Sequence, residues 1–450
     1  MTNDMTTGTP WKLILKFVIP VALGNIFQQV YSIVDSIIVG RFVGVEALAA
    51  VGVTGPLTFI VLGWVTGITS GFSILISQSY GAGDQKRLRH YVAMSLYLCL
   101  ALAVLMTAGC LAANRWLLRL MNTPENIMDA TALYIGIIYA GLAASIAYNM
   151  LSGILRALGD SRTPLYFLIF SSVLNIVLDL LLIRTFHLGV AGAAYATVIS
   201  QAVSAILCFA FMTKHYRFLA FSREEGKFSW HSFANLMKMG VPMALQFSIT
   251  GLGVMIVQSA LNPFGEIPIA AFSAGSKVMN LVTQQIMIAL GVGMATYVGQ
   301  NWGAGNIHRV RQGVRTGCVL AVIVGVLSMV LITLVGEAFV GLFVTENVQE
   351  VTVYAAEYFS IARWFFVPLA MIFVFRNSLQ GLGDGFFPMM GGVFELAARA
   401  IGVAVLVKPL GFTGIVLTDP CAWLAALIPI VPVYLIRVRK LQGKEQRSTE

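Results

Sequence analysis

The chain carries little charge. Asp, Glu, Lys and Arg make up 11% of its 450 residues, against about 25% in an ordinary soluble protein, while hydrophobic residues make up 58%. The mean hydropathy is +0.83. This composition excludes an ordinary soluble domain, because so few charged groups cannot cover a water-exposed surface, and it favours a membrane protein.

Cysteine pairs and nucleotide-binding motifs are also missing. The five cysteines are odd in number and scattered through apolar segments, with no disulfide or metal spacing. No G-x-x-x-x-G-K-[ST] sequence occurs, so we do not expect the chain to hydrolyse ATP. We therefore expect neither an enzyme nor a resident cofactor. Any active transport would draw on an ion gradient.

Long hydrophobic runs are what the chain has instead. A membrane-spanning helix needs about 20 apolar residues. The first run begins near Leu13 and lacks a small-residue cleavage site, so we expect it to remain as a span. We predict an all-α polytopic membrane protein with twelve spans, at residues 13–38, 48–77, 91–113, 130–155, 164–184, 190–212, 236–260, 268–298, 312–336, 351–378, 388–408 and 412–436.

The sequence also repeats itself. Gln-Ser-Tyr-Gly-Ala-Gly at 78–83 returns as Gln-Asn-Trp-Gly-Ala-Gly at 300–305, 222 residues later. Similar pairs in the same order indicate a duplication. Because each half has an even number of spans, both halves enter the membrane from the same side, and a pseudo-two-fold axis along the membrane normal relates them. The further pairs are 16–20 with 238–242, 158–164 with 382–388, and 188–192 with 410–414.

The duplication predicts the domain boundaries. The longest polar connector lies between the halves and reads as a cytoplasmic linker. The residues after Arg437 are short and basic, and we expect them to be disordered. The predicted parts are an N-terminal six-helix lobe at 1–213, the linker at 214–235, a C-terminal six-helix lobe at 236–437 and the tail at 438–450.

The positions of the basic residues predict the orientation. On the predicted topology, 21 of the 29 Lys and Arg residues lie on the side of the N-terminus and five on the opposite side. Cytoplasmic segments of membrane proteins carry this excess, so both termini are expected in the cytoplasm. The net charge of +9 therefore follows membrane topology, and no nucleic-acid partner is expected.

Two acidic residues lie inside predicted spans of the first half, where a charge costs roughly 2.5–3.5 kcal/mol near the bilayer centre. Each shares its helix face with other polar residues, and a third polar stripe lies on the sixth span. The three stripes are Asp35 with Gln28 and Tyr31, Asp179 with Asn175 and Ser172, and Thr197 with Gln201 and Ser204.

These stripes predict a buried cation site. Burial and a neighbouring like charge favour the protonated form of a carboxyl group, so the site could take a proton. Carboxylate, amide and hydroxyl oxygens also suit a hard cation. The alternative is that Asp35 and Asp179 lie near helix ends and are solvated, since Asp35 is only about a turn from Gly40.

The second half does not copy these acids. Arg399 stands at the position of Asn175, with Glu395 four residues before it and Asp419 on the next span. One hypothesis is that Arg399 pairs with Asp419 or Glu395 and supplies a fixed positive charge, which would make this charge network structural. The alternative is that Glu395 faces a cavity and attracts cationic substrates.

Other polar and aromatic residues are candidates for a substrate cavity. Lys277 shares a face of the eighth span with Asn280 and Gln284. Aromatic and methionine side chains offer an adaptable surface for bulky ligands, although such residues in spans usually only pack. The complete candidate set is Gln28, Tyr31, Tyr139, Asn149, Gln201, Lys277, Asn280 and Gln284.

The motifs resemble those of the multidrug and toxic compound extrusion (MATE) transporters over essentially the whole chain. They are Pro20 with Asp35, Val39-Gly40-Arg41, residues 78–83, Arg-Ala-Leu-Gly-Asp at 156–160, and the copies in the second half. The resemblance implies an antiporter that expels bulky, often cationic compounds by alternating access in exchange for H⁺ or Na⁺. The cytoplasmic (inner) membrane of a prokaryote, a monomer, and small amphipathic or cationic substrates are the corresponding expectations.

Within that family, Asp35, Asn175, Asp179 and Thr197 look like the cation-coupling site of the prokaryotic DinF-like branch. The same residues would be the ligands of Na⁺ if that is the coupling ion, and Pro20 looks like the hinge of the first helix. The NorM-like branch has acids on its seventh and tenth helices, whereas the seventh span here has none. A lipid-linked precursor flippase of the same wider superfamily is the alternative function.

Overall fold

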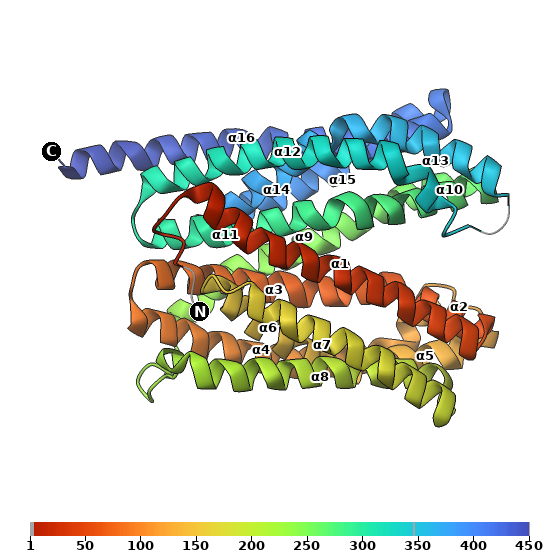
Figure 1. Cartoon of the computed structure of the whole chain (residues 1–450), viewed down its shortest axis with the longest axis horizontal. Helices are drawn as coiled ribbons and strands as arrows, with labels where there is room; N and C mark the ends of the chain where they lie inside the picture. The colour runs from red at the N-terminus through yellow and green to blue at the C-terminus, as the bar shows by residue number, and fades with distance from the viewer. Residues whose placement is uncertain (1–3, 345–346, 450) are drawn as a thin grey trace. The chain divides into compact units, whose positions relative to one another are not determined.

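The computed structural model describes residues 4–344 and 347–449, and within these ranges it contains helices and turns but no β-strand (Figure 1). Eleven described helical segments are long and apolar enough to span a membrane. The bent pair α5 (Glu125–Ala140) and α6 (Leu142–Ala157), with 45° between its axes, supplies a twelfth. The all-α fold and the count of twelve predicted spans are thus confirmed.

The helices pack into two units of comparable size, formed by residues 23–244 and by residues 4–22 with 245–449. Unit 1 contains α2 (Val45–Val53), α3 (Gly55–Gly81), α4 (Gln85–Leu120), α5, α6, α7 (Arg162–Asp179), the π-helix η1 (Leu180–Thr185) and α8 (Gly189–His215). Unit 2 contains α10 (Glu266–Met279), the π-helix η4 (Asn280–Gln284), α11 (Gln285–Gly303), α12 (Ile307–Val340), α13 (Val348–Ala362), α14 (Phe366–Gly381), α15 (Phe386–Leu410) and α16 (Phe412–Thr449).

Two helices belong to both units. The first part of α1 (Pro10–Phe42), up to Ala22, packs in unit 2, and its remainder packs in unit 1. The first part of α9 (Trp230–Leu261), up to Ala244, packs in unit 1, and its remainder packs in unit 2. The boundaries of the packing units therefore differ from those of the lobes expected at 1–213 and 236–437. The reason is that α1 and α9 each begin in one unit and end in the other.

Close helix contacts hold these exchanged segments in place. A Cβ atom added to Gly71 of α3 would lie 2.6 Å from the Cα atom of Gly240 in α9. A Cβ atom added to Gly293 of α11 would lie 2.6 Å from a methyl carbon of Val18 in α1. Both contacts join positions that differ by 222 between the repeats. Small residues at these crossings allow the helices to approach closely, as is typical of membrane helices.

A proline precedes each change of unit. Pro20 lies inside α1 and Pro242 inside α9, two residues before the boundaries after Ala22 and Ala244. Proline lacks a backbone N–H and interrupts the helical hydrogen-bond ladder, which makes it a natural point of bending. The hinge role predicted for Pro20 is not tested by this position and stays a prediction.

Backbone conformation records the duplication. Gly83 and Gly305 both have positive φ angles, of 68° and 72°, directly after the ends of α3 and α11, where glycine permits the left-handed conformation that closes a helix. Asn122 and Asn347 also form a left-handed pair. Since strained backbone positions return at nearly the same offset, the two halves share their turns as well as their spans. The other glycine pairs with positive φ are 44 and 265, 159 and 383, and 189 and 411.

The linker is folded onto unit 1. Nη2 of Arg89, near the start of α4, lies 2.7 Å from Oε1 of Glu225, and the Nδ1–H group of His90 donates to the Glu225 carbonyl oxygen at 2.8 Å. The hydroxyl group of Tyr216 donates to the buried Asp160 carboxylate at 2.8 Å. These bonds attach Tyr216 and Glu225, at the start and in the middle of the segment between α8 and α9, to the turn between α6 and α7 and to the start of α4.

The C-terminal residues differ from the sequence prediction. Helix α16 continues to Thr449, so the backbone of most of the tail expected to be disordered at 438–450 is helical. The segment is rich in Arg, Lys, Gln and Glu, which are good helix formers. It continues an existing helix, so the unfavourable nucleation of a new helix is not needed. The side chains of 442–449, and residue 450, lie outside the described part.

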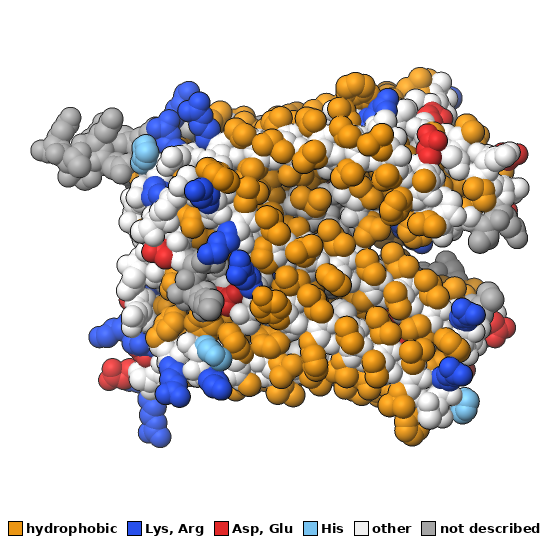
Figure 2. All heavy atoms as spheres, viewed as in Figure 1, with side chains coloured by type: hydrophobic (Ala, Val, Ile, Leu, Met, Phe, Trp, Pro, Cys, Tyr) orange, Lys and Arg blue, Asp and Glu red, His pale blue; other side chains and the backbone are white. Residues whose placement is uncertain are grey.

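Surface composition fits a membrane protein. On the face shown in Figure 2, hydrophobic side chains cover the middle of the helices of each unit, and Lys and Arg gather towards the helix ends. Many apolar side chains of both units are well exposed, including Leu105 on α4 and Leu334 on α12. Exposed apolar helix surfaces of this extent are expected where helices face lipid.

Candidate functional site

The central feature of unit 1 is a pair of carboxyl groups. Asp35 lies in the second half of α1, and Asp179 is the last residue of α7 before the π-helix η1. Asp179 is fully buried. π-helical turns are rare and frequently lie at functional sites. The change from α-helix to π-helix at Asp179 therefore supports a functional role for this residue.

The two carboxyl groups lie within hydrogen-bonding reach of each other. Oδ1 of Asp35 and Oδ1 of Asp179 are buried, and neither has a hydrogen-bond partner among the described residues. Ionised carboxylates only accept hydrogen bonds and repel each other, so a proton or another cation would stabilise the pair. The two buried Oδ1 atoms are therefore free to accept a proton or to bind a cation.

Asn175 and Thr197 complete the polar wall. With its amide oriented to satisfy both neighbours, Asn175 donates from Nδ2 to Oδ2 of Asp179 at 3.2 Å and accepts from the backbone N–H of Thr197 at 3.2 Å. The Thr197 hydroxyl group donates to the carbonyl oxygen of Ala193 at 3.1 Å. The structure thus brings together the four residues that the sequence singled out from three separate spans.

Two tyrosines border the pair. The phenol groups of Tyr31 on α1 and Tyr134 on α5 interact electrostatically with both Asp35 and Asp179. Tyr31 was expected on this face, but Tyr134 was not, because α5 has no acidic or amide residue that marks the same helix face. Only the packing of α5 beside the carboxyl pair makes Tyr134 part of this site.

The remaining cavity candidates of unit 1 group differently. The Ser145 hydroxyl group of α6 hydrogen-bonds Oε1 of Gln201 on α8, and Asn149 donates to the Ser145 carbonyl oxygen at 2.9 Å. Tyr139 is buried, and its hydroxyl group has no partner among the described residues. Gln28 is exposed.

Unit 2 contains an ion-pair network in place of the carboxyl pair. Nε of Arg399 on α15 lies 2.9 Å from Oδ1 of Asp419 on α16, and Nη1 lies 3.6 Å from Oε2 of Glu395. Glu395 also pairs with Arg376 of α14. Because two buried arginines flank Glu395, its charge is already compensated inside the protein. This geometry favours the structural interpretation of the network over attraction of cationic substrates.

Arg376 was missed as a member of the network. On the predicted topology, Arg376 lies near the end of the tenth span at 351–378 and counts among the 21 basic residues on the side of the N-terminus, whereas the structure buries it within α14. In the sequence, an arginine near the end of a span indicates the orientation of the protein in the membrane. Only the packing of α14 against α15 brings Arg376 to Glu395. One basic residue is therefore removed from the 21 assigned to the cytoplasmic side, which leaves the charge asymmetry intact.

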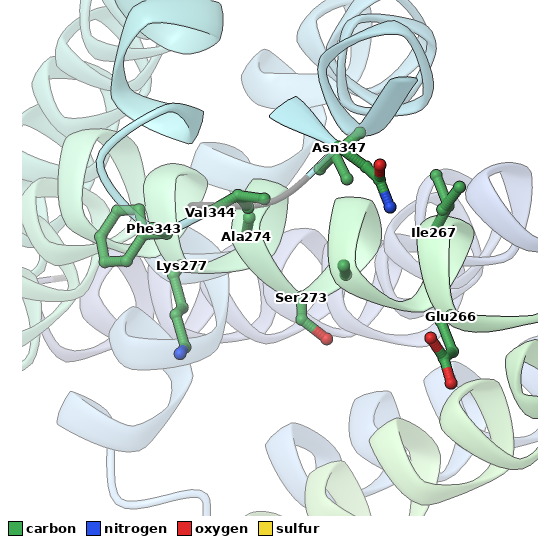
Figure 3. A pocket seen from close by; sticks show the side chains of 10 residues that line it. Glu266, Ile267, Ser273, Ala274, Lys277, Phe343, Val344 and Asn347 are labelled. Carbon is green, nitrogen blue, oxygen red and sulfur yellow. The ribbon is translucent and has the colours of Figure 1, made fainter. Parts of the chain in front are cut away.

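Lys277 lines a separate pocket in unit 2 (Figure 3). The pocket has a volume of about 380 Å³ and lies between α10 and residues near Phe343 and Asn347. Nζ of Lys277 lies 5.9 Å from the centre of the Phe343 ring, and Glu266 is at the other end of the same helix face. Asn280, predicted on the face of Lys277 together with Gln284, donates to Oε1 of Gln284 at 3.2 Å within η4.

Two helical repeats, one of which buries a carboxyl pair that forms no ion pair with a described Lys or Arg, define the architecture of a membrane transporter. The profile of the MatE family matches residues 20–181 and 242–405, once in each half of the duplication. The chain belongs to the MatE family.

Several relatives cover nearly the full length. The probable multidrug resistance protein YoeA of Bacillus subtilis (strain 168) is 30% identical, over 98% of this chain and 97% of its own length. The multidrug export protein MepA of Staphylococcus aureus (strain MW2) is 23% identical, over 95% of this chain and 94% of its own. The outward-facing structure of a multidrug resistance MATE family transporter has a TM-score of 0.91 at 23% identity, covering 98% of this chain and 100% of that one, which establishes the fold.

Proposed function

We propose that the protein is a cation-coupled antiporter that exports bulky, cationic or amphipathic compounds from the cytoplasm, with H⁺ or Na⁺ as the coupling ion. The observation that carries the proposal is the contact between Asp35 and Asp179, whose buried Oδ1 atoms have no partner among the described residues. The multidrug resistance and export functions named for YoeA and MepA support the substrate class.

The proposed mechanism is competition for the carboxyl pair. With both groups ionised, mutual repulsion is relieved by a positive substrate. Entry of the coupling ion from outside neutralises the pair, removes the attraction for the substrate, and lets α1 repack about Pro20. A ligand shifts a conformational equilibrium only through different affinities for its two states, and the carboxyl pair supplies that difference through its charge.

The residues around the pair would serve either coupling ion. A proton would be shared between Asp35 and Asp179. Sodium would be held by the carboxylate oxygens together with the Asn175 amide oxygen and the Thr197 hydroxyl oxygen, once the Asn175 amide rotates from Asp179. A proton as the coupling ion would make export depend on the pH gradient, whereas sodium would make it depend on the Na⁺ gradient.

Transport by purified protein in proteoliposomes tests the function. We expect substrate movement when either a pH gradient or a Na⁺ gradient is imposed alone, and loss of this movement in Asp35→Asn and Asp179→Asn. Asp129→Asn is the matched control, because Asp129 lies in unit 1 but forms an exposed ion pair with Arg115. Gradient-driven export retained by both membrane-site variants would exclude the mechanism.

The orientation is a second part of the proposal. In unit 1 the basic residues at the start of α4, the end of α6 and the start of α7 lie at the same predicted side as the linker, in line with cytoplasmic termini. A phosphatase reporter joined to the C-terminus would stay inactive and a cytoplasmic fluorescent reporter would be active. The reverse result would overturn the proposed topology.

A further inference from the structure

A groove in unit 2 has a basic rim and an apolar floor. It has a volume of about 640 Å³ and lies between the start of α12, α14 and the end of α16. His308, Arg311 and Arg315 of α12 and Arg439 of α16 line it, together with Val314, Phe375, Tyr434 and Val438. We call this set the basic groove. Its lining contains no acidic residue.

The cations of the basic groove lack protein counter-ions. Among the residues that the structure describes, Arg311, Arg315 and Arg439 form no ion pair, whereas the nearby Arg437 lies 2.8 Å from Oδ2 of Asp384. All three unpaired arginines are exposed. Several like charges around one hollow repel each other, so an anion bound there would be stabilised.

The first repeat shows what occupies the equivalent position. Arg311 corresponds to Arg89 at the offset of 222, and Arg89 binds the linker carboxylate of Glu225 at 2.7 Å. The linker thereby supplies unit 1 with an anion near the start of α4. In unit 2 the start of α12 has no described carboxylate in that role, and the groove stays open between α12 and α16.

The groove lies at the level of a lipid headgroup. Arg315 comes just before the uncharged run at residues 317–336, whose 20 residues extend about 30 Å and match the hydrocarbon core. Phe375 and Tyr434 pack edge to face at 5.4 Å between ring centres on the floor. Exposed apolar residues continue from the groove along both helices, with Val319 56% and Leu435 48% exposed.

We propose that the basic groove binds an anionic phospholipid, with the headgroup phosphate between Arg311, Arg315 and Arg439 and an acyl chain along α12 and α16. The basic rim matches the phosphate, and the apolar floor matches the chain. A free phosphate ion would use the rim but not the floor. The lipid would take the part that Glu225 plays in unit 1 and fasten α16 to α12.

The test measures lipid retention and thermal unfolding of the full-length protein in mixed micelles with phosphatidylglycerol or phosphatidylcholine. We expect preferential retention of phosphatidylglycerol and a higher unfolding temperature with it. Each basic residue near a membrane surface contributes about fivefold to binding of acidic lipid, so the triple variant Arg311→Gln, Arg315→Gln and Arg439→Gln should lose roughly 100-fold in affinity.

The matched control changes Lys86, Arg217 and Arg223 to Gln, which removes three exposed basic residues from unit 1 without touching the groove. It should keep the preference for phosphatidylglycerol. Equal retention of both lipids by the unaltered protein would overturn the proposal, as would an equal loss in the control. Stabilisation by inorganic phosphate that matches phosphatidylglycerol would assign the groove to a free anion and also overturn it.

Discussion

The Nε atom of Arg399 lies 2.9 Å from Oδ1 of Asp419, inside the second repeat, where the first repeat has Asn175 and Thr197. A fixed arginine thus takes the place that a mobile cation would have beside the carboxyl groups of unit 1. In unit 2 the buried charges form ion pairs with each other, so that the network is neutral. In unit 1 the two neighbouring carboxyl groups have no described Lys or Arg as an ion-pair partner. This asymmetry is the physical reason for our proposal that ion coupling takes place in unit 1.

Replacing Arg399 should destabilise the protein. Arg399→Gln leaves the partly buried Asp419 without its partner and removes one of the two arginines beside the buried Glu395, and breaking a buried ion pair in this way costs about 3 kcal/mol. Thermal unfolding in detergent would report the loss. Arg399→Met combined with Asp419→Leu removes both charges and should recover most of the stability. A single variant as stable as the unaltered protein would show that the pair is not structural.

The crossing of α3 and α9 should not tolerate a larger residue at Gly71. Gly71→Val would push side-chain atoms into the backbone of Gly240, where even a Cβ atom would lie 2.6 Å away, and we expect a loss of about 3 kcal/mol and little folded protein. Gly109→Ala on α4 is the control, because an added Cβ atom meets nothing within 4 Å there. Size-exclusion profiles of the two variants make the comparison, and similar profiles would refute the close crossing.

The phenol group of Tyr134 should affect the coupling ion. Tyr134→Phe keeps the ring but removes the polar hydroxyl group, which interacts electrostatically with Asp35 and Asp179, and we expect binding of the coupling ion to weaken about fivefold, a change of ~1 kcal/mol. The concentration of H⁺ or Na⁺ that gives half-maximal export would measure this. Tyr139→Phe, at another buried tyrosine whose hydroxyl group has no described partner, should leave it unchanged. Equal effects of both variants would contradict a specific role for Tyr134.

The linker should loosen in acid. The hydrogen bond from Arg89 and those from Ser222 lower the pKa of Glu225 below its ordinary value of about 4.3. A lowered folded-state pKa stabilises the attached linker above the ordinary value, and this stabilisation is lost as the pH falls through the lowered pKa. Limited proteolysis at residues 216–229 should therefore accelerate below about pH 4.

Glu225→Gln is the variant for that experiment. It removes the charge at every pH, so its linker should be cleaved rapidly at neutral pH and show little further acceleration in acid. Glu224→Gln, at the exposed neighbouring position, is the control and should behave as the unaltered protein does. A protease-resistant linker in Glu225→Gln would show that its attachment rests on other contacts.

Much of the site could be predicted because its residues stand out locally. Asp35, Asn175, Asp179 and Thr197 are polar side chains at helical spacing inside apolar runs, where each needs a physical reason. Tyr134 and Arg376 carried no such local signal for their sites. A tyrosine in an apolar helix usually packs, and an arginine near a span end usually marks topology, so their roles depended on which neighbouring helix each one faces.

The sequence by itself determined the membrane class, the twelve spans and the duplication, because hydropathy, punctuation by glycine and proline, and a repeat offset are properties of the linear chain. The tertiary structure decided which helix faces meet. It exchanged the first parts of α1 and α9 between the packing units, joined Arg376 to Glu395, and brought Asp35 to Asp179. Such contacts depend on close approach at positions such as Gly71 and Gly240, which residue spacing along one helix does not specify.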